Sequence, residues 1–356
     1  IDRAAAIANN ENDERHLPSE NSPSATPSST LDSDESHQQL VDGTRFWTDR
    51  TFAAWDAAIT HDEDDERRNP FGSQAFANGS SHCSERNPNR SLILAAECGD
   101  LELISSLIAE GADANTEDTN QRTPLHLAAL NGHVNAMKAL HALGAAVNAR
   151  NSLQQTPLHY AAQNGHVDAI NTLKTLGAGV NVRSKDQETP LLFAAEHGHV
   201  GAINALHALG APVNARDCLQ QTPLHLAAQK GHVNTIHTLA ALGADVNARN
   251  SRRETPLHLA GRNCYVDVVT TLGTLGADVN ARNGGHETPL HLAADNGGVN
   301  AINAFHALGA DMNAGDSLRE TPLHYSARNG HTNVINALGT LGADMNARSS
   351  LQITPL

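Results

Sequence analysis

Residues 123–155 read TPLHLAALNGHVNAMKALHALGAAVNARNSLQQ. The opening Thr-Pro-Leu of this stretch returns every 33 residues, at Thr156, Thr189, Thr222, Thr255, Thr288, Thr321 and Thr354. A fixed period of this size is typical of chains built from stacked copies of one small structural unit. The fold therefore depends on what one 33-residue unit forms and on how the copies pack.

Each unit predicts two short helices. Thr123 can cap a helix that begins at Pro124, because the fixed φ of proline suits the first turn and its missing N–H would have no partner there. Gly132 and Gly144 follow two apolar stretches, where a residue in left-handed conformation ends a helix. Two helices of about three turns cannot bury their apolar faces alone, so neighbouring units must stack. The predicted core residues of this unit are Leu125, Leu127, Ala128, Ala129, Val134, Met137, Leu140 and Leu143.

The motifs Thr-Pro-Leu-His-Leu-Ala-Ala at 123–129, Asn-Gly-His at 131–133 and Gly-Ala-Asp-Val-Asn-Ala-Arg at 243–249 resemble those of ankyrin repeats. The resemblance covers residues 90–356. It implies an all-α fold, an α-solenoid of helix-turn-helix pairs with projecting β-hairpin fingers and a concave surface that grips partners. The predicted repeats begin near residues 90, 123, 156, 189, 222, 255, 288 and 321, with a truncated ninth at 354, so we expect the chain to be a fragment.

Three departures from the family pattern matter. The family usually has glycine two residues before each threonine, whereas this chain has Gln, Arg or His there, which leaves the geometry of the fingers open. Leu192 replaces a histidine of the first helix, so one hydrogen bond is expected to be lost. In the repeat at 255–287, Gly261 replaces a core alanine and Cys264 replaces the glycine that ends the helix. We expect this repeat to open first.

The chain before residue 90 has a different composition. Residues 1–40 are acidic and rich in Ser and Pro, which predicts a disordered tail. Residues 41–89 contain most of the aromatic side chains, and Phe52, Trp55 and Ile59 share one face of a possible short helix that caps the solenoid. A partner-binding motif and the remnant of a lost domain are the alternatives. The acidic run at 62–66 is typical of solvated surface or a linker.

Composition and charge exclude several classes of function. Aromatic residues are only 3% of the chain, which does not favour an all-β fold. The net charge of −15 opposes binding to nucleic acid or anionic lipid, and no apolar run approaches the ~20 residues that span a bilayer. Cys83, Cys98, Cys218 and Cys264 form no paired motif, which favours a reducing compartment. We therefore expect a monomeric intracellular protein that is located in the cytoplasm and does not insert into a membrane.

The recurring histidines invite a catalytic or metal-binding interpretation. However, His126, His159, His225, His258, His291 and His324 each lie three residues after a threonine, as a structural hydrogen bond within every repeat would require. By resemblance, His133, His166, His199, His232 and His331 bond between repeats. There is no HExxH, no paired cysteine motif, no GxSxG and no phosphate-binding loop. The sequence therefore predicts no catalytic residue, no metal site and no cofactor.

Positions that vary between repeats are the predicted partner contacts, because stacking leaves them free. One set lies four, three and one residues before each threonine and is expected at the finger tips: Ser152, Leu153, Gln155, Lys185, Asp186, Glu188, Cys218, Leu219, Gln221, Ser251, Arg252, Glu254, Ser317, Leu318 and Glu320. By resemblance, the second set, seven and eight residues after each threonine, lines the concave face: Gln163, Asn164, Glu196, His197, Gln229, Lys230, Arg262, Asn263, Asp295, Asn296, Arg328 and Asn329.

These patterns predict a non-enzymatic scaffold that binds a protein partner on its finger and inner-helix surface. The alternative is the substrate-recruiting or regulatory region of a larger enzyme whose catalytic domain lies outside this chain. A row of arginines could also attract an acidic peptide, although the simpler interpretation is that the family commonly has a basic residue at this position. The row consists of Arg150, Arg183, Arg216, Arg249, Arg282 and Arg348.

Overall fold

The computed structural model describes residues 87–356. The predictions for the tail at 1–40, for the capping helix near Phe52 and for the acidic run at 62–66 lie outside the described residues. Within 87–356 every regular element is a helix, as predicted from the sequence. The chain divides at residue 81 into two units, and the repeats belong to the second.

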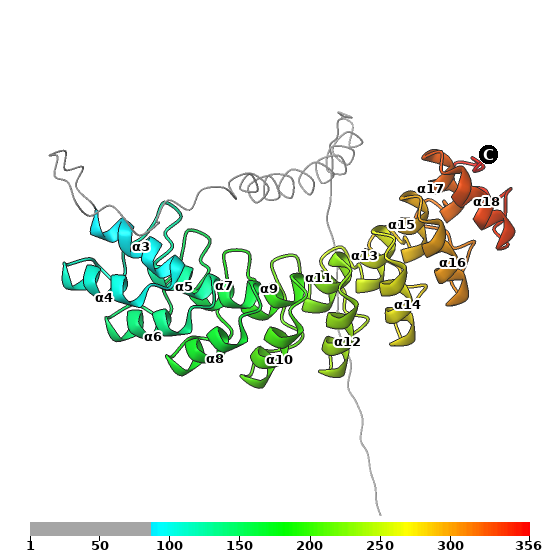
Figure 1. Cartoon of the computed structure of the whole chain (residues 1–356). Helices are drawn as coiled ribbons and strands as arrows, with labels where there is room; N and C mark the ends of the chain where they lie inside the picture. The colour runs from blue at the N-terminus through cyan, green and yellow to red at the C-terminus, as the bar shows by residue number, and fades with distance from the viewer. Residues whose placement is uncertain (1–86) are drawn as a thin grey trace, which may run out of the picture. The chain divides into compact units, whose positions relative to one another are not determined.

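Each repeat contributes a first and a second helix (Figure 1). The first helices are α3 (Pro88–Cys98), α5 (Pro124–Leu130), α7 (Pro157–Gln163), α9 (Pro190–Glu196), α11 (Pro223–Lys230), α13 (Pro256–Arg262), α15 (Pro289–Asp295) and α17 (Pro322–Arg328). The second helices are α4 (Leu101–Ala109), α6 (Val134–Ala142), α8 (Val167–Thr175), α10 (Val200–Ala208), α12 (Val233–Ala241), α14 (Val266–Thr274), α16 (Val299–Ala307) and α18 (Thr332–Thr340).

The helices form two layers. First helices pack against the first helices of adjacent repeats, and second helices pack against second helices in the same way. One continuous apolar core runs between the layers from Leu92 to Ala343. The predicted α-solenoid is therefore confirmed. Two residues predicted for the core of the repeat at 123 are not buried: Val134 is half-buried at the start of α6, and Leu143 is 41% exposed because α6 ends at Ala142 and Leu143 is its cap.

The Thr-Pro-Leu-His motif begins a first helix through a reciprocal cap. The backbone N–H of Thr123 donates to Nδ1 of His126 at 3.0 Å, and the threonine hydroxyl accepts from the backbone N–H of His126. On the other side of the ring, Nε2 donates to the carbonyl of Gln155 at 3.1 Å. The other five histidines at this position make the same bonds. These histidines therefore join each helix to the next finger, which confirms the predicted structural role.

The second histidine explains why glycine ends the first helix. The ring of His133 lies over Gly99, where a Cβ would approach the ring to 2.7 Å, and its Nε2 donates to the carbonyl of Glu97 at 3.0 Å. Gly99 also needs its left-handed φ of 73°. His166, His232 and His331 form the same bond between repeats, as predicted.

The repeat at 255–287 departs from this arrangement twice. Cys264 takes the glycine position with φ of 55°, and Gly298 takes the histidine position that would lie over it. The thiol occupies the space of the missing ring, so the two substitutions compensate in volume. The histidine bond is replaced by a weak one, from the Cys264 thiol to the carbonyl of Ala293 at 4.0 Å. Tyr265 covers Gly231 in the same way without a hydrogen bond to the preceding repeat. Gly261 is not simply a lost core alanine: a Cβ at this position would meet the carbonyl oxygen of Pro289 and lie 3.2 Å from the buried ring of Phe305.

Candidate interaction surface

Each finger is a five-residue turn between one repeat and the next. In the finger 151–155, the N–H of Gln154 donates to the carbonyl of Asn151 at 2.8 Å, and the N–H of Asn151 donates to the carbonyl of Gln155 at 3.0 Å. The side chain of Asn151 accepts two further bonds, from the backbone of Leu153 and Gln155. This pattern is a tight turn followed by one left-handed residue. The predicted β-hairpin is therefore reduced to its turn, because no strand pairing extends beyond it in the described residues.

The left-handed residue of each finger lies two residues before the threonine, where ankyrin repeats usually have glycine. Gln154 has φ of 58°, and its counterparts in the other fingers lie between 58° and 65°. Such a conformation costs a residue with a Cβ roughly 1–2 kcal/mol. The fingers thus keep the geometry that glycine would allow and accept the strain. The residues concerned are Gln121, Gln154, Gln187, Gln220, Arg253, His286, Arg319 and Gln352.

Backbone hydrogen bonds join neighbouring finger tips. The N–H of Lys185 donates to the carbonyl of Leu153, and the N–H of Cys218 donates to the carbonyl of Asp186, both at 2.9 Å. The same bond recurs along the array. The residues three before each threonine therefore stand side by side, and we call them the tip row: Asn120, Leu153, Asp186, Leu219, Arg252, Gly285, Leu318 and Leu351.

The predicted finger contacts divide into two groups. The residues four and three before each threonine are exposed at the tips, as predicted: Ser152, Leu153, Lys185, Asp186, Cys218, Leu219, Ser251, Arg252, Ser317 and Leu318. The residues one before each threonine are not at the tips. Gln155 and Glu254 are buried, and Glu188, Gln221 and Glu320 are half-buried. Each lies at the base of a finger, because its carbonyl accepts the bond from a buried histidine wherever the first helix has one.

The second predicted set lies at the ends of the first helices. Gln163, Glu196, His197, Gln229, Lys230, Arg262 and Asp295 are half-buried, whereas Asn164, Asn263, Asn296, Arg328 and Asn329 are exposed. Several of these side chains bond to backbone carbonyls: Asn164 to Tyr160, Asn296 to Leu292, and Asn263 to Leu259 and Gln229. The asparagines therefore hold helix ends and neighbouring repeats in place.

Each finger base faces the end of the first helix that follows it. Glu254 forms an ion pair with Arg262, and Glu320 pairs with Arg328 at 3.1 Å. Burial acts to raise the pKa of Glu254, but the charge of Arg262 and the hydrogen bonds from Asn250 and Arg262 together outweigh it, so the pKa is lowered. The structure thus brings these two parts of the predicted site together on one surface.

Three aromatic residues beneath this surface were not predicted from the sequence; Phe193 and Tyr325 are buried and Tyr160 is half-buried. Tyr160, Phe193 and Tyr325 stand four residues after their threonines, where the other repeats from 123 onward have leucine. The hydroxyl of Tyr325 lies 2.9 Å from carboxylate oxygens of both Glu287 and Asp316, and burial followed by these two charges raises its pKa. In the sequence, these aromatic residues could have been recognised because they replace the leucine found at the same position of the other repeats.

The arginine row has a packing role. Arg150 donates through Nη1 to the carbonyl of Arg183 at 3.1 Å, and Arg183 donates to that of Arg216 at 2.9 Å. Arg216, Arg249 and Arg282 continue the series, and the last donates to Gly315. Each guanidinium therefore holds the backbone of the next repeat.

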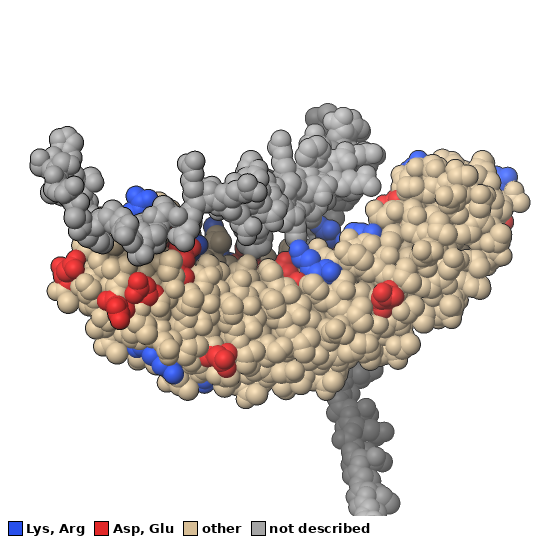
Figure 2. All heavy atoms as spheres, in the orientation of Figure 1, with Lys and Arg blue, Asp and Glu red and all other residues tan. Residues whose placement is uncertain are grey.

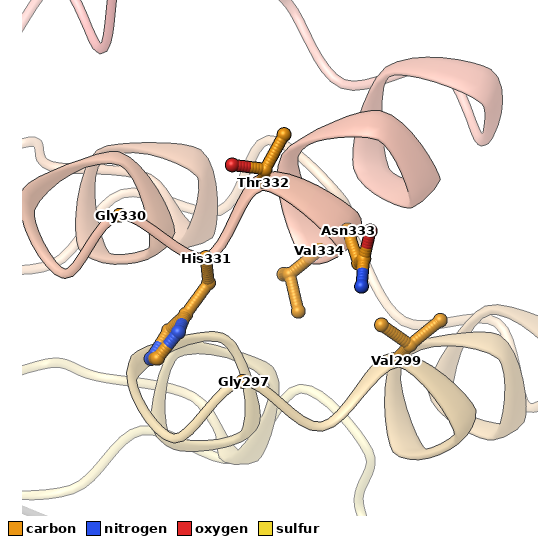
Figure 3. A pocket seen from close by; sticks show the side chains of 7 residues that line it. All are labelled: Gly297, Val299, Gly330, His331, Thr332, Asn333 and Val334. Atoms are coloured by element: carbon orange, nitrogen blue, oxygen red, sulfur yellow. The ribbon is translucent and has the colours of Figure 1, made fainter.

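Other site types find little support within 87–356. No group of His, Cys, Asp and Glu in this range could hold a metal ion, and none of its helices is long and apolar enough to cross a membrane. A shallow hollow of about 300 Å³ lies between the starts of α16 and α18 (Figure 3). Its lining is Gly297, Val299, Gly330, His331, Thr332, Asn333 and Val334, and His331 already bonds to the carbonyl of Asp295.

Comparisons with known proteins agree with this architecture. A family model described as ankyrin repeats in three copies matches residues 92–184, 174–250, 191–283 and 257–349, which together span most of the chain. Among solved structures, the human ASB11 ankyrin repeat domain is 31% identical with a TM-score of 0.56. The match covers 62% of this chain and 98% of that one. No curated protein matches the chain.

Proposed function

The chain belongs to the ankyrin-repeat family, whose members generally serve as protein-interaction modules, and we propose that it is a non-enzymatic scaffold that binds a protein partner. The proposed contact surface combines the tip row with the ends of the first helices. The observation that carries the proposal is the exposure of Leu153, Leu219 and Leu318, at 43%, 54% and 52%, on a backbone fixed by hydrogen bonds. Apolar side chains held rigidly outward are typical of contact surfaces.

The surroundings of the titratable groups support a binding role over a catalytic one. The buried histidines are committed to finger carbonyls, and burial lowers the pKa values of His126, His159, His225 and His258 to about 4. They are therefore neutral hydrogen-bonding groups near pH 7. We also propose that the chain acts as a monomer. Nucleic acid is not an expected partner, because the arginines of the row already donate to backbone carbonyls. The free thiols of Cys98, Cys218 and Cys264 support an intracellular location.

Affinity capture from a lysate of the source cells tests the proposal. The full chain is compared with a finger variant, Leu153→Ala, Leu219→Ala and Leu318→Ala, and with a control variant, Leu101→Ala, Leu103→Ala and Leu143→Ala. The control leucines are 39%, 42% and 41% exposed but lie on α4 and at the end of α6. We expect the original chain and the control to retain the same proteins and the finger variant to lose them. Equal retention by the finger variant, or none by any form, would refute the proposed function.

A further inference from the structure

The repeats differ in how they neutralise the carboxylate at the finger base. In the repeats that begin at 255 and 321, a glutamate one residue before the threonine faces an arginine seven residues after it. These are the pairs Glu254–Arg262 and Glu320–Arg328. In both pairs a guanidinium group contacts the finger-base carboxylate, so this group fits against the base of a finger.

The repeats at 189 and 288 have an acid at both positions. In the repeat at 288 the finger-base carboxylate of Glu287 accepts hydrogen bonds from the side chains of Tyr325 and Asn283. The repeat at 189 has no tyrosine in this role.

Glu188 stands at the finger base of the repeat at 189, and Glu196 replaces the arginine. Glu196 pairs with Lys230 of the next repeat at 3.4 Å, whereas the Glu188 carboxylate accepts a hydrogen bond from the Ser184 hydroxyl at 3.1 Å. Burial, followed by the charge of Glu196, raises the pKa of Glu188 to about 7. Among the described residues no cation pairs with Glu188 as Arg262 pairs with Glu254.

The tip of the same finger adds a second carboxylate between two apolar groups. Asp186 is exposed, and the backbone bonds of the tip row place it between Leu153 and Leu219. The face drawn in Figure 2 is mostly uncharged, with charged side chains in small groups. Charge is therefore local on that face. At the finger tips, Asp186 combines negative charge with the apolar side chains of Leu153 and Leu219.

Within the proposed protein-binding function, on which this inference rests, we propose that finger 184–188 seats an arginine of the partner through Asp186 and Glu188. Leu153 and Leu219 contact apolar residues on either side of that arginine. The partner segment supplies the cation that Arg262 and Arg328 supply within their own repeats.

The spacing of the repeats defines the partner's sequence pattern. Packed helices lie about 8–10 Å apart, so neighbouring positions of the tip row are separated by a similar distance. A polyproline II segment rises about 3.1 Å per residue with three residues per turn. Every third side chain therefore projects to the same side about 9 Å further on. The occupant we infer is an extended segment with arginine in the middle and an apolar residue three positions before and after it.

Selection from a library of random 12-residue peptides tests this inference with the full chain as the immobilised target. Recovered peptides are measured against the original chain, against the variant Asp186→Asn with Glu188→Gln, and against the control Asp168→Asn with Asp267→Asn. The control removes the same charge from exposed residues at the starts of α8 and α14. Circular dichroism verifies that both variants fold.

We expect recovered peptides to share the apolar-x-x-Arg-x-x-apolar pattern and to bind the seat variant at least about tenfold more weakly, as loss of charge-assisted hydrogen bonds predicts. The control should bind unchanged, and arginine to lysine in the peptide should weaken binding less than arginine to alanine. Peptides without a basic residue, equal binding to the seat variant, or no recovered peptide would overturn the arginine seat. If capture from lysate still depends on the tip leucines, the proposed function stands while the seat falls.

Discussion

Acid should unfold this array through its buried histidines. His126, His159, His225 and His258 are at most 1% exposed, and burial lowers their pKa values from 6.5 to about 4. In the unfolded chain the same rings bind protons near pH 6.5, whereas the folded chain resists protonation until about pH 4. The stabilising contribution is therefore complete above pH 6.5 and is lost as pH falls toward 4.

The size of the effect follows from the number of rings. One proton taken up on unfolding changes the free energy of unfolding by about 1.4 kcal/mol per pH unit, so four rings give about 5.5 kcal/mol per unit between pH 6.5 and 4. A domain with a total stability of about 5–15 kcal/mol should unfold within that window. Glu188 and Asp217 act in the opposite direction, because burial raises their pKa values, and they reduce the slope.

Urea unfolding followed by circular dichroism at a series of pH values between 7.5 and 5 measures this slope. The variant His225→Leu copies the natural arrangement at Leu192, where the Thr189 hydroxyl is buried without a partner. It should be less stable at pH 7.5, and its slope should be smaller by about 1.4 kcal/mol per pH unit. His141→Leu, at an exposed position on α6, should leave the slope unchanged. A flat stability from pH 7 to 5, or equal slopes for all three proteins, would refute the reasoning.

Two further predictions concern local stability. Gln187→Gly and Gln220→Gly should each raise the free energy of unfolding by about 0.5–1 kcal/mol, since relief of the left-handed strain exceeds the entropy cost of glycine, whereas alanine at either position should give no gain. Urea midpoints at pH 7.5 measure both changes, and a loss of stability in the glycine variants would contradict the strain argument. The repeat at 255–287 should open first, because Tyr265 and Gly298 leave it without the histidine bond to either neighbour and Gly261 and Gly273 weaken its helices. Hydrogen exchange should show α14 less protected than α6 and α8, and finding 255–287 the best protected repeat would show this to be wrong.

Features that depend on neighbours in the chain could be predicted from the sequence. The cap formed by Thr123 and His126 joins residues three apart, and its recurrence in other repeats distinguishes it from a single catalytic site. The glycines that end helices are recognisable for the same reason. Gln155 was misplaced at a finger tip because its position depends on where a five-residue turn closes, and one residue separates a tip from a buried base. That closure is set by the left-handed Gln154, which no pattern of polar residues reveals.

Features that join different repeats could not be read in this way. Cys264 looks like a defect in its own repeat, and only the packing shows that Gly298, 34 positions later, makes room for its thiol. Gly261 and Phe305 exchange volume in the same manner. The sequence contained each residue, but the period of 33 aligns equivalent positions and does not show which of them touch.

The pairing of finger bases with helix ends follows the same logic and links stability to binding. Replacing Glu196 by arginine would give Glu188 the partner that Glu254 has, and it would remove the present ion pair of Glu196 with Lys230. Because burial opposes the charge of Glu188, we expect the new pair to stabilise the fold more than the lost pair did. Where a sequence lacks a stabilising pair that equivalent repeats contain, a functional constraint on that position is expected. A double variant with Asp186→Asn and Glu196→Arg should accordingly be more stable than the original chain while losing the selected peptides. Such a result would separate the demands of folding from those of recognition within a single finger.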